Sequence, residues 1–115
     1  MTTNPDPEIV LVTTVTDDRE AAERIARTLV EGRAAACVQV GGPVTSVYRW
    51  QGAVDSAQEW SVAAKTTAAN AAMVVAEIKR LHSYEVPEIL VTPVLGGHGP
   101  YLEWVAEQSS ATPTS

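Results

Sequence analysis

Residues 34–66 read AAACVQVGGPVTSVYRWQGAVDSAQEWSVAAKT, and this stretch decides the fold. Two segments of alternating or β-branched residues flank a Gln-Gly link at 51–52, and a glycine there favours a tight hairpin turn. Each segment is much longer than a usual strand of about 5 to 6 residues, so we expect arms that project beyond the sheet. Gly-Gly-Pro at 41–43 predicts a bend or bulge within the first arm. The residues predicted to share a face are Val44, Ser46, Tyr48 and Trp50 in the first arm, and Trp60, Val62, Ala64 and Thr66 in the second.

A strand and a helix are predicted before the hairpin. Residues 8–15, EIVLVTTV, form a short β-branched run that is apolar on both faces, which is typical of a central strand. Residues 17–32, DDREAAERIARTLVEG, indicate an amphipathic helix in which Asp17 caps the start, Glu20 completes a capping box and Gly32 ends the helix. The predicted buried stripe consists of Ala22, Ile25, Ala26, Leu29 and Val30.

Three further elements are predicted after the hairpin. Residues 67–81, TAANAAMVVAEIKRL, predict a second amphipathic helix with Thr67 as its cap. Residues 88–95, EILVTPVL, predict a final strand, and Pro100 suits the first position of a short helix over 100–108. The apolar stripe of the second helix is predicted to be Ala71, Val74, Val75, Ile78 and Leu81.

The element order is β-α-β-β-α-β plus a short C-terminal helix, which predicts an α+β fold of the ferredoxin-like, split βαβ kind. Such a fold has a four-stranded antiparallel sheet with both long helices on one face. The other face has no helix of its own. We expect that face to meet another subunit, because several apolar and aromatic residues are predicted to be available there: Val47, Tyr48, Trp50, Trp60 and Val62.

Length and composition limit the class of protein. The 115 residues suit a single domain, which we place at 8–108, between disordered tails at 1–7 and 109–115 that are rich in Pro, Thr and Ser. A net charge of −6 argues against nucleic acid or an anionic membrane as a partner. With one cysteine, no secretory signal and no apolar run long enough for a membrane helix, we expect a cytoplasmic protein.

Few residues offer metal-ligating chemistry. The nitrogen and sulfur donors are Cys37, His82 and His98, and no two stand at a ligand spacing, so we expect no closed zinc site within one chain. Cys37 in an apolar strand is interpreted as a small core residue, and His98 between glycines as an exposed loop residue. His82 is left open between a metal ligand and a positive partner for a helix C-terminus.

The stretch LHSYEVPEIL at 81–90 concentrates the remaining polar chemistry. Lys65, Tyr84, Glu85 and Glu88 could form an acid–base set, but a structural explanation is favoured for each of them. No nucleophile elbow, Walker loop or dinucleotide fingerprint occurs, so no enzyme class is indicated.

The quoted motifs resemble the CutA family, which is named for divalent-cation tolerance. The matching stretches are EGRAAACVQV at 31–40, TSVYRWQGAV at 45–54, EWSVAAKT at 59–66, HSYEVPEILVTPV at 82–94 and YLEWV at 101–105. The resemblance covers Ile9 to Val105. It implies a ferredoxin-like subunit in a homotrimer whose hairpins wrap neighbouring subunits, a role in the response to metal ions including copper, and no established catalysis.

The sequence departs from the family pattern where copper is concerned. Copper-binding members carry a cysteine at the end of the first strand and a His pair before the Tyr, whereas this chain has VTTV at 12–15 and only His82. Ser83 also replaces a usual proline. We therefore expect no required cofactor, and at most weak binding of Cu²⁺ or Zn²⁺ by His82 with Glu85 or Glu88.

The resemblance favours a non-enzymatic, trimeric binding or assembly protein. Its ligand cleft is predicted to contain Tyr84 and Glu88, together with Trp50 and Lys65 of the same or the next subunit. The alternative is a PII-like trimeric signalling module that binds a small ligand or nucleotide between subunits. The short Gln-Gly link and the scarcity of basic residues make that alternative weaker.

Overall fold

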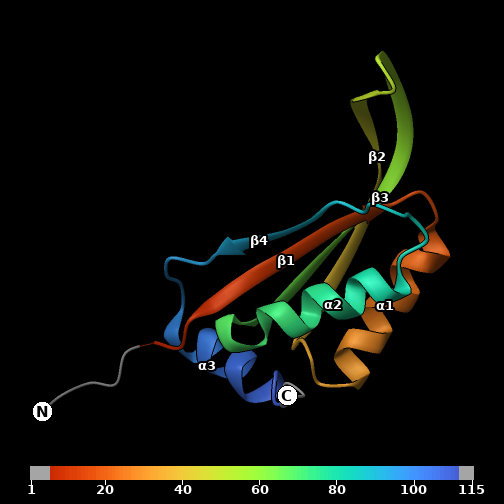
Figure 1. The fold of residues 1–115 in the computed structure, drawn as a ribbon. Helices are drawn as coiled ribbons and strands as arrows, with labels where there is room; N and C mark the ends of the chain where they lie inside the picture. Colours follow the sequence, from red (N-terminus) through yellow and green to blue (C-terminus); the bar gives the residue numbers. More distant parts are fainter. Residues whose placement is uncertain (1–5, 112–115) are drawn as a thin grey trace, which may run out of the picture.

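The computed structural model describes residues 6–111 and contains the predicted elements in the predicted order (Figure 1). The four strands form one sheet in the order β2-β3-β1-β4, and every neighbouring pair is antiparallel. The α+β, ferredoxin-like prediction is therefore confirmed for the chain. The elements are β1 (Ile9–Thr16), α1 (Arg19–Glu31), β2 (Cys37–Trp50), β3 (Ala53–Thr67), the 3-10 turn η1 (Ala68–Asn70), α2 (Ala71–Leu81), β4 (Ile89–Pro93) and α3 (Gly99–Gln108).

The main core lies between the sheet and the two long helices, which cover the same face (Figure 1). Ile25, Leu29 and Ile78 from the helices are fully buried against Val12 and Val62 from the central strands. A smaller core forms where α3 packs at the end of the sheet, and it contains Ile9, Ala36, Leu102 and Val105. The helices therefore leave most of one sheet face without a cover.

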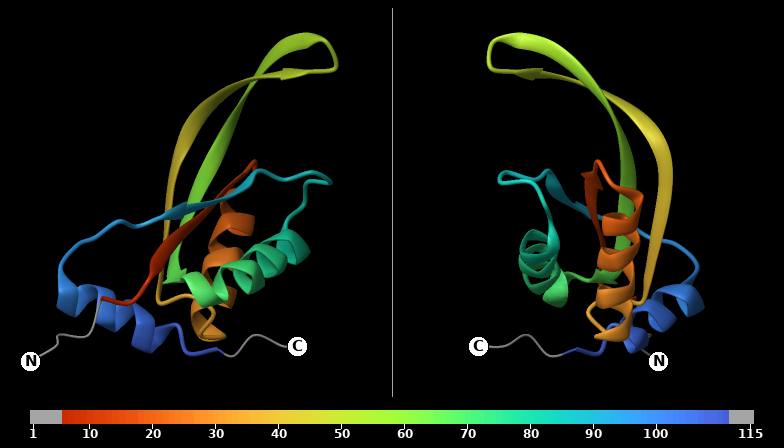
Figure 2. Two further views of the ribbon diagram at one scale, coloured as in Figure 1. Left: turned by 60° about the vertical axis from the view of Figure 1, so that its left-hand side comes forward. Right: turned by 90° about the vertical axis from the view of Figure 1, so that its right-hand side faces the viewer.

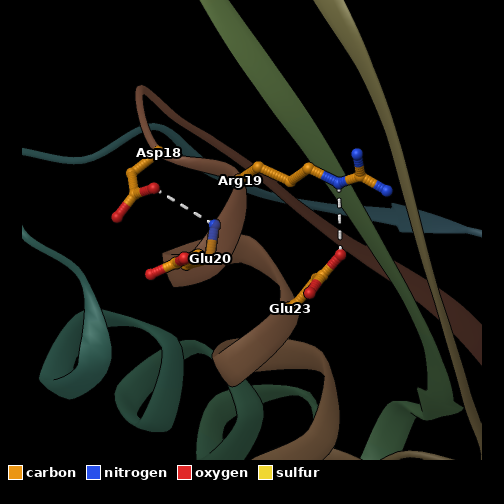
Figure 3. Close-up of polar contacts among 4 residues, drawn as sticks. All are labelled: Asp18, Arg19, Glu20 and Glu23. Atoms are coloured by element: carbon orange, nitrogen blue, oxygen red, sulfur yellow. Dashed lines mark hydrogen bonds and ion pairs between the residues drawn. The ribbon is translucent and has the colours of Figure 1, made fainter.

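The start of α1 differs from the prediction by one residue. Asp18, not Asp17, is the cap: its backbone is extended (φ −133°, ψ 121°), and its Oδ1 accepts the backbone N–H of Glu20 at 3.1 Å (Figure 3). The extended backbone of the cap residue is what allows its side chain to turn back to the first free N–H groups. Arg19 and Glu23 form an exposed i, i+4 ion pair on the outer side of the same turn.

The buried stripe of α1 is also rotated from the predicted one. Ala21 is buried, whereas Val30, predicted to be buried, is 41% exposed. Ala21, Ile25 and Leu29 recur every four residues along the inner face, which the crossing of α1 over the sheet selects. At the other end Gly32 follows the helix with φ −82°, and Arg33 takes the left-handed conformation at φ 60°.

The hairpin extends well beyond the rest of the sheet and curves (Figure 2). Trp50 pairs with Ala53 across the Gln51-Gly52 turn, where both turn residues have positive φ values of 49° and 80°. Such values define the turn that matches the twist of the two arms. The register of β2 against β3 shifts between Gly41 and Val44, so the bulge predicted at residues 41–43 is confirmed.

The prediction for the open sheet face was wrong for Trp60 and Val62. Val62 is fully buried in the main core, and Trp60 packs against that core. The reason is register: Val62 pairs with Thr14, a buried residue of the helix-covered face. Val47 and Trp50 are exposed, at 69% and 62%, on the arm that extends past the helices.

The C-terminal boundary differs from the prediction over residues 109–111. Ser109 is buried, and its carbonyl accepts a hydrogen bond from the Asn70 side chain at 3.0 Å. The Ala111 N–H donates to the carbonyl of Arg33 at 2.9 Å. These residues are held because they supply partners for polar groups at the helix ends. Of the tails predicted at 1–7 and 109–115, residues 1–5 and 112–115 lie outside the described residues.

Within residues 6–111, no helix has the length and apolar character needed to cross a membrane.

Gly42 is expected to tolerate no side chain, because it has φ +139° and an added Cβ would lie 3.0 Å from the Glu59 carbonyl oxygen. Gly42→Ala should lower the free energy of unfolding by about 1 to 3 kcal/mol, measured by urea unfolding at fixed protein concentration. Gly41→Ala is the matched control, because its added Cβ would meet only the Ser61 hydroxyl, at 3.4 Å. Equal effects of the two substitutions would contradict this explanation.

Candidate functional site

A cavity of about 520 Å³ lies between the hairpin arm and the segment that joins α2 to β4. The arm contributes residues from both β2 and β3, and Figure 1 shows the joining segment passing close to the point where the arm leaves the sheet. Valine and alanine side chains supply its apolar surface, and aromatic rings and carboxylates supply the rest. The lining residues are Val15, Ser46, Val47, Tyr48, Trp50, Ala57, Glu59, Tyr84, Val86 and Glu88.

Strand alternation explains why most of these residues meet; Val47 is the exception, because alternation places it on the other side of β2 from Ser46 and Tyr48. Thr14 and Thr16 are buried beneath the helices, so Val15 between them points to the open face of the sheet. On β3 the same period places Glu59 on the open face, where it pairs with Val44 beyond the bulge. The bulge increases the local twist of the arm, and both views of Figure 2 show the arm curving over the joining segment.

Glu59 and Tyr84 form the central polar contact of the cavity. The Tyr84 hydroxyl donates a hydrogen bond to Glu59 Oε2 at 2.9 Å, and only 7% of Glu59 is exposed. Burial, and next the hydrogen bond to the Glu59 carboxylate, raise the pKa of Tyr84 well above its ordinary value. Tyr84 therefore remains a hydrogen-bond donor throughout the physiological pH range.

His82 fixes the joining segment. Its Nε2 lies 2.7 Å from the Val15 carbonyl oxygen, and its Nδ1 accepts the Tyr84 backbone N–H at 3.0 Å. Because Nδ1 is an acceptor, the proton of the neutral ring sits on Nε2 and is donated to Val15. The His82 and Tyr84 rings also pack at a centroid distance of 4.7 Å. His82 is the C-cap residue of α2, but its ring binds β1 and Tyr84 instead of the last carbonyls of the helix.

A second contact fixes the start of β4. The buried Thr14 hydroxyl donates to the Glu88 carbonyl oxygen at 2.6 Å, which holds that backbone against β1 while the Glu88 side chain lines the cavity. Both ends of the joining segment are thus attached to β1.

The structure brings together three of the four residues predicted for a ligand cleft. Trp50, Tyr84 and Glu88 line the cavity, but Lys65 does not. Lys65 pairs with Leu11 further along the sheet, and its Nζ lies 5.6 Å from the centroid of the Tyr101 ring.

Sequence reasoning missed Tyr48 and Glu59 as cavity residues. Alternation along the strand did place Glu59 and Trp60 on opposite faces of the sheet, and this was the signal in the sequence that could have indicated Glu59. It could not show that the Glu59 carboxylate is buried, because that burial depends on Tyr84, which lies 25 residues away in the sequence.

The residues of one chain do not form a metal centre within the part that the structure describes. No group of three or more His, Cys, Asp or Glu residues in 6–111 is arranged to hold a metal ion. Both ring nitrogens of His82 already have hydrogen-bond partners, and Cys37 is half-buried. A metal at His82 would have to replace one of those two hydrogen bonds.

Comparison with known proteins gives one consistent result. The family described as CutA1 divalent ion tolerance protein matches residues 9–108. The chain is 42% identical over 102 residues to the divalent-cation tolerance protein CutA of Thermus thermophilus, covering 89% of this chain and 97% of that protein. It is 36% identical to the chloroplastic CutA protein of Arabidopsis thaliana over 86% of its own length but spans only 54% of that protein. The crystal structure of CutA1 from Shewanella sp. SIB1 matches with a TM-score of 0.86 and 38% identity, covering 92% of this chain and 99% of that one.

The raised pKa of Tyr84 predicts a late tyrosine ionisation. The part of the tyrosinate absorbance that Tyr84→Phe removes should have its midpoint above the ordinary value of about 10. The folded state holds this proton more tightly than the unfolded chain does. The contribution of the protonated Tyr84 hydroxyl to the free energy of unfolding is therefore complete below a pH of about 10, and it is lost as the pH rises through the raised pKa.

The control is the same absorbance difference between wild type and Tyr84→Phe, measured in urea. The midpoint of that difference should return to the ordinary tyrosine pKa. A midpoint in the folded protein at or below that value would refute the buried Tyr84–Glu59 hydrogen bond.

Proposed function

The chain belongs to the family of CutA1 divalent ion tolerance proteins, and from this premise we propose that it is a homotrimeric binding and assembly protein that contributes to the tolerance of divalent cations, copper among them. In this proposal the protein acts by binding and not by catalysis. The observation that carries the proposal is the exposed apolar surface of the hairpin arm.

The arm carries large apolar side chains on both of its faces. Val47 and Val54 are 69% and 65% exposed, and Trp50 is 62% exposed near the turn. Alternation along β2 directs Val47 and Trp50 to opposite faces of the arm, because they are three positions apart in the sequence. Exposed apolar surface on this scale favours burial against another protein surface, and a second copy of the chain is always available to provide one.

Trimeric closure is supported by the shape of the subunit and by the family. An arm that reaches across a neighbouring sheet makes a head-to-tail contact, in which two different surfaces meet. Such contacts form a closed ring when the rotation between copies closes. Ring closure leaves no arm uncovered, and the CutA resemblance supplies three as the number of copies.

The proposed ligand cleft follows from the same arrangement. Trp50, Tyr84 and Glu88 are supplied by one subunit, and Lys65 could reach them only from a neighbouring one. The proposed metal role of His82 requires Cu²⁺ or Zn²⁺ to displace the hydrogen bond from the Tyr84 N–H to Nδ1. Binding should therefore be weak unless a neighbouring subunit adds donors.

Light scattering coupled to size exclusion should give a mass three times the chain mass of 12.2 kDa at micromolar concentration. Val47→Asp places a charge on the exposed arm and should shift the population toward the monomer. Glu20→Ala, on the surface of α1, should leave the trimer intact. A wild-type mass of 12.2 kDa would refute the assembly.

Metal tolerance can be tested in a bacterial host that lacks its own CutA protein. Expression of the wild-type chain should restore growth in toxic copper, and Val47→Asp at equal expression should not, because the site is proposed to require the assembly. His82→Ala should reduce growth and abolish the heat of copper binding in calorimetry, whereas His98→Ala should change neither. Equal growth with and without the wild-type protein would contradict the proposed role.

A further inference from the structure

The cavity between the arm and the joining segment has the chemistry of a cation site. We propose that it binds a protonated alkylamine, with the ammonium group at Glu59 beside Tyr84 and the alkyl chain along the rest of the lining. This ligand class is not implied by a role in metal tolerance. The cavity is the ligand cleft of the proposed function, and the inference rests on the proposed assembly only where the ammonium group comes from a second copy.

Glu59 is a buried carboxylate without a cationic partner. Only 7% of the residue is exposed, and the Tyr84 hydroxyl satisfies Oε2. Within residues 6–111 no hydrogen bond joins Oε1 to the protein, and the two ion pairs there involve other carboxylates. Oε1 is not one of the fully buried unpartnered atoms of that range, so it remains open to a ligand. Burying a carboxylate is costly unless a cation or further hydrogen bonds compensate for the lost water. An ammonium group in the cavity would supply both.

The rest of the lining suits an organic cation. Tyr48, Trp50 and Tyr84 are among the lining residues, and the faces of aromatic rings attract alkylammonium groups. Val15 and Val86 offer apolar surface for an alkyl chain, and a volume of about 520 Å³ accommodates a small amine.

Other ligand classes fit the cavity less well. A divalent ion needs about six oxygen donors, but the lining has only two carboxylates, Glu59 and Glu88, and Tyr84 already occupies an oxygen of the first. An anion would lie against those carboxylates, and no Lys, Arg or His is among the lining residues.

An alkylammonium group could come from a free amine or from a lysine of a second copy. Lys65 lies on the open face of the sheet, and its Nζ has a contact with the Tyr101 ring but no ion pair within the described residues. The chemistry is the same in both cases, a primary ammonium on an alkyl chain, so the experiment must distinguish the two sources.

The Trp50 indole N–H provides a local signal for NMR titration. The probe is n-butylamine at neutral pH, where an alkylamine with a pKa of about 10 is charged, and n-butanol is the neutral control of matched shape. We expect saturable shifts with the amine and none with the alcohol. Titration of Lys65→Met alongside the wild type separates the sources. Binding to both proteins identifies a free amine as the ligand, and binding to Lys65→Met alone identifies Lys65 of a neighbouring copy as the occupant.

Glu59→Gln tests the proposed anchor, because glutamine keeps the shape and can still accept the Tyr84 hydrogen bond. It should weaken amine binding about tenfold or more, whereas Glu20→Gln on α1 should not change it. Glu88→Gln, with folding checked by circular dichroism, provides a second variant if Glu59→Gln does not fold. The proposal is overturned if neither the wild type nor Lys65→Met binds the amine, or if butanol binds equally well. It is also overturned if Mg²⁺ displaces the amine at equal concentration, or if the folded Glu59→Gln and Glu88→Gln variants bind the amine as the wild type does.

Discussion

The pairing of β3 with both β1 and β2 is the constraint on which the rest of the subunit depends. Alternate residues of a paired strand must point to opposite faces, so one register assigns Val62 and Ala64 to the helix-covered core. The same register assigns Glu59 and Lys65 to the open face. A shift by one residue would expose the core side chains and bury two charged ones. The core and the cavity are therefore two consequences of one set of strand hydrogen bonds.

The joining segment depends on this sheet for its conformation. It contains little regular structure, and its backbone is held from outside: His82 binds the Val15 carbonyl, Thr14 binds the Glu88 carbonyl, and Tyr84 binds Glu59. These contacts join β1 and β3 to the segment at three points. The order of the segment is therefore tertiary in origin, and the proposed site depends on the same contacts.

The open sheet face and the arm explain why the subunit alone is an incomplete description of the proposed function. Two features have no complement within residues 6–111: the exposed apolar arm and the Glu59 carboxylate, which forms no ion pair there. Exposed apolar surface and a carboxylate with one unpartnered oxygen are both satisfied by contact with a partner of suitable chemistry. Assembly is proposed to satisfy the first, and an ammonium group the second.

Local patterns in the sequence determined the elements and their order. The turn at Gln51-Gly52, the bulge at 41–43, the Thr67 cap and the two amphipathic helices all follow from residue type and spacing over a few positions. Only the tertiary structure decided how these elements face one another. Alternation showed that Glu59 and Trp60 lie on opposite faces, but the register with Thr14 and Thr16 determined which face the helices cover. The separation of Lys65 from Tyr84, and the burial of Glu59 and Ser109, depend on contacts between residues distant in the sequence, which no local period records.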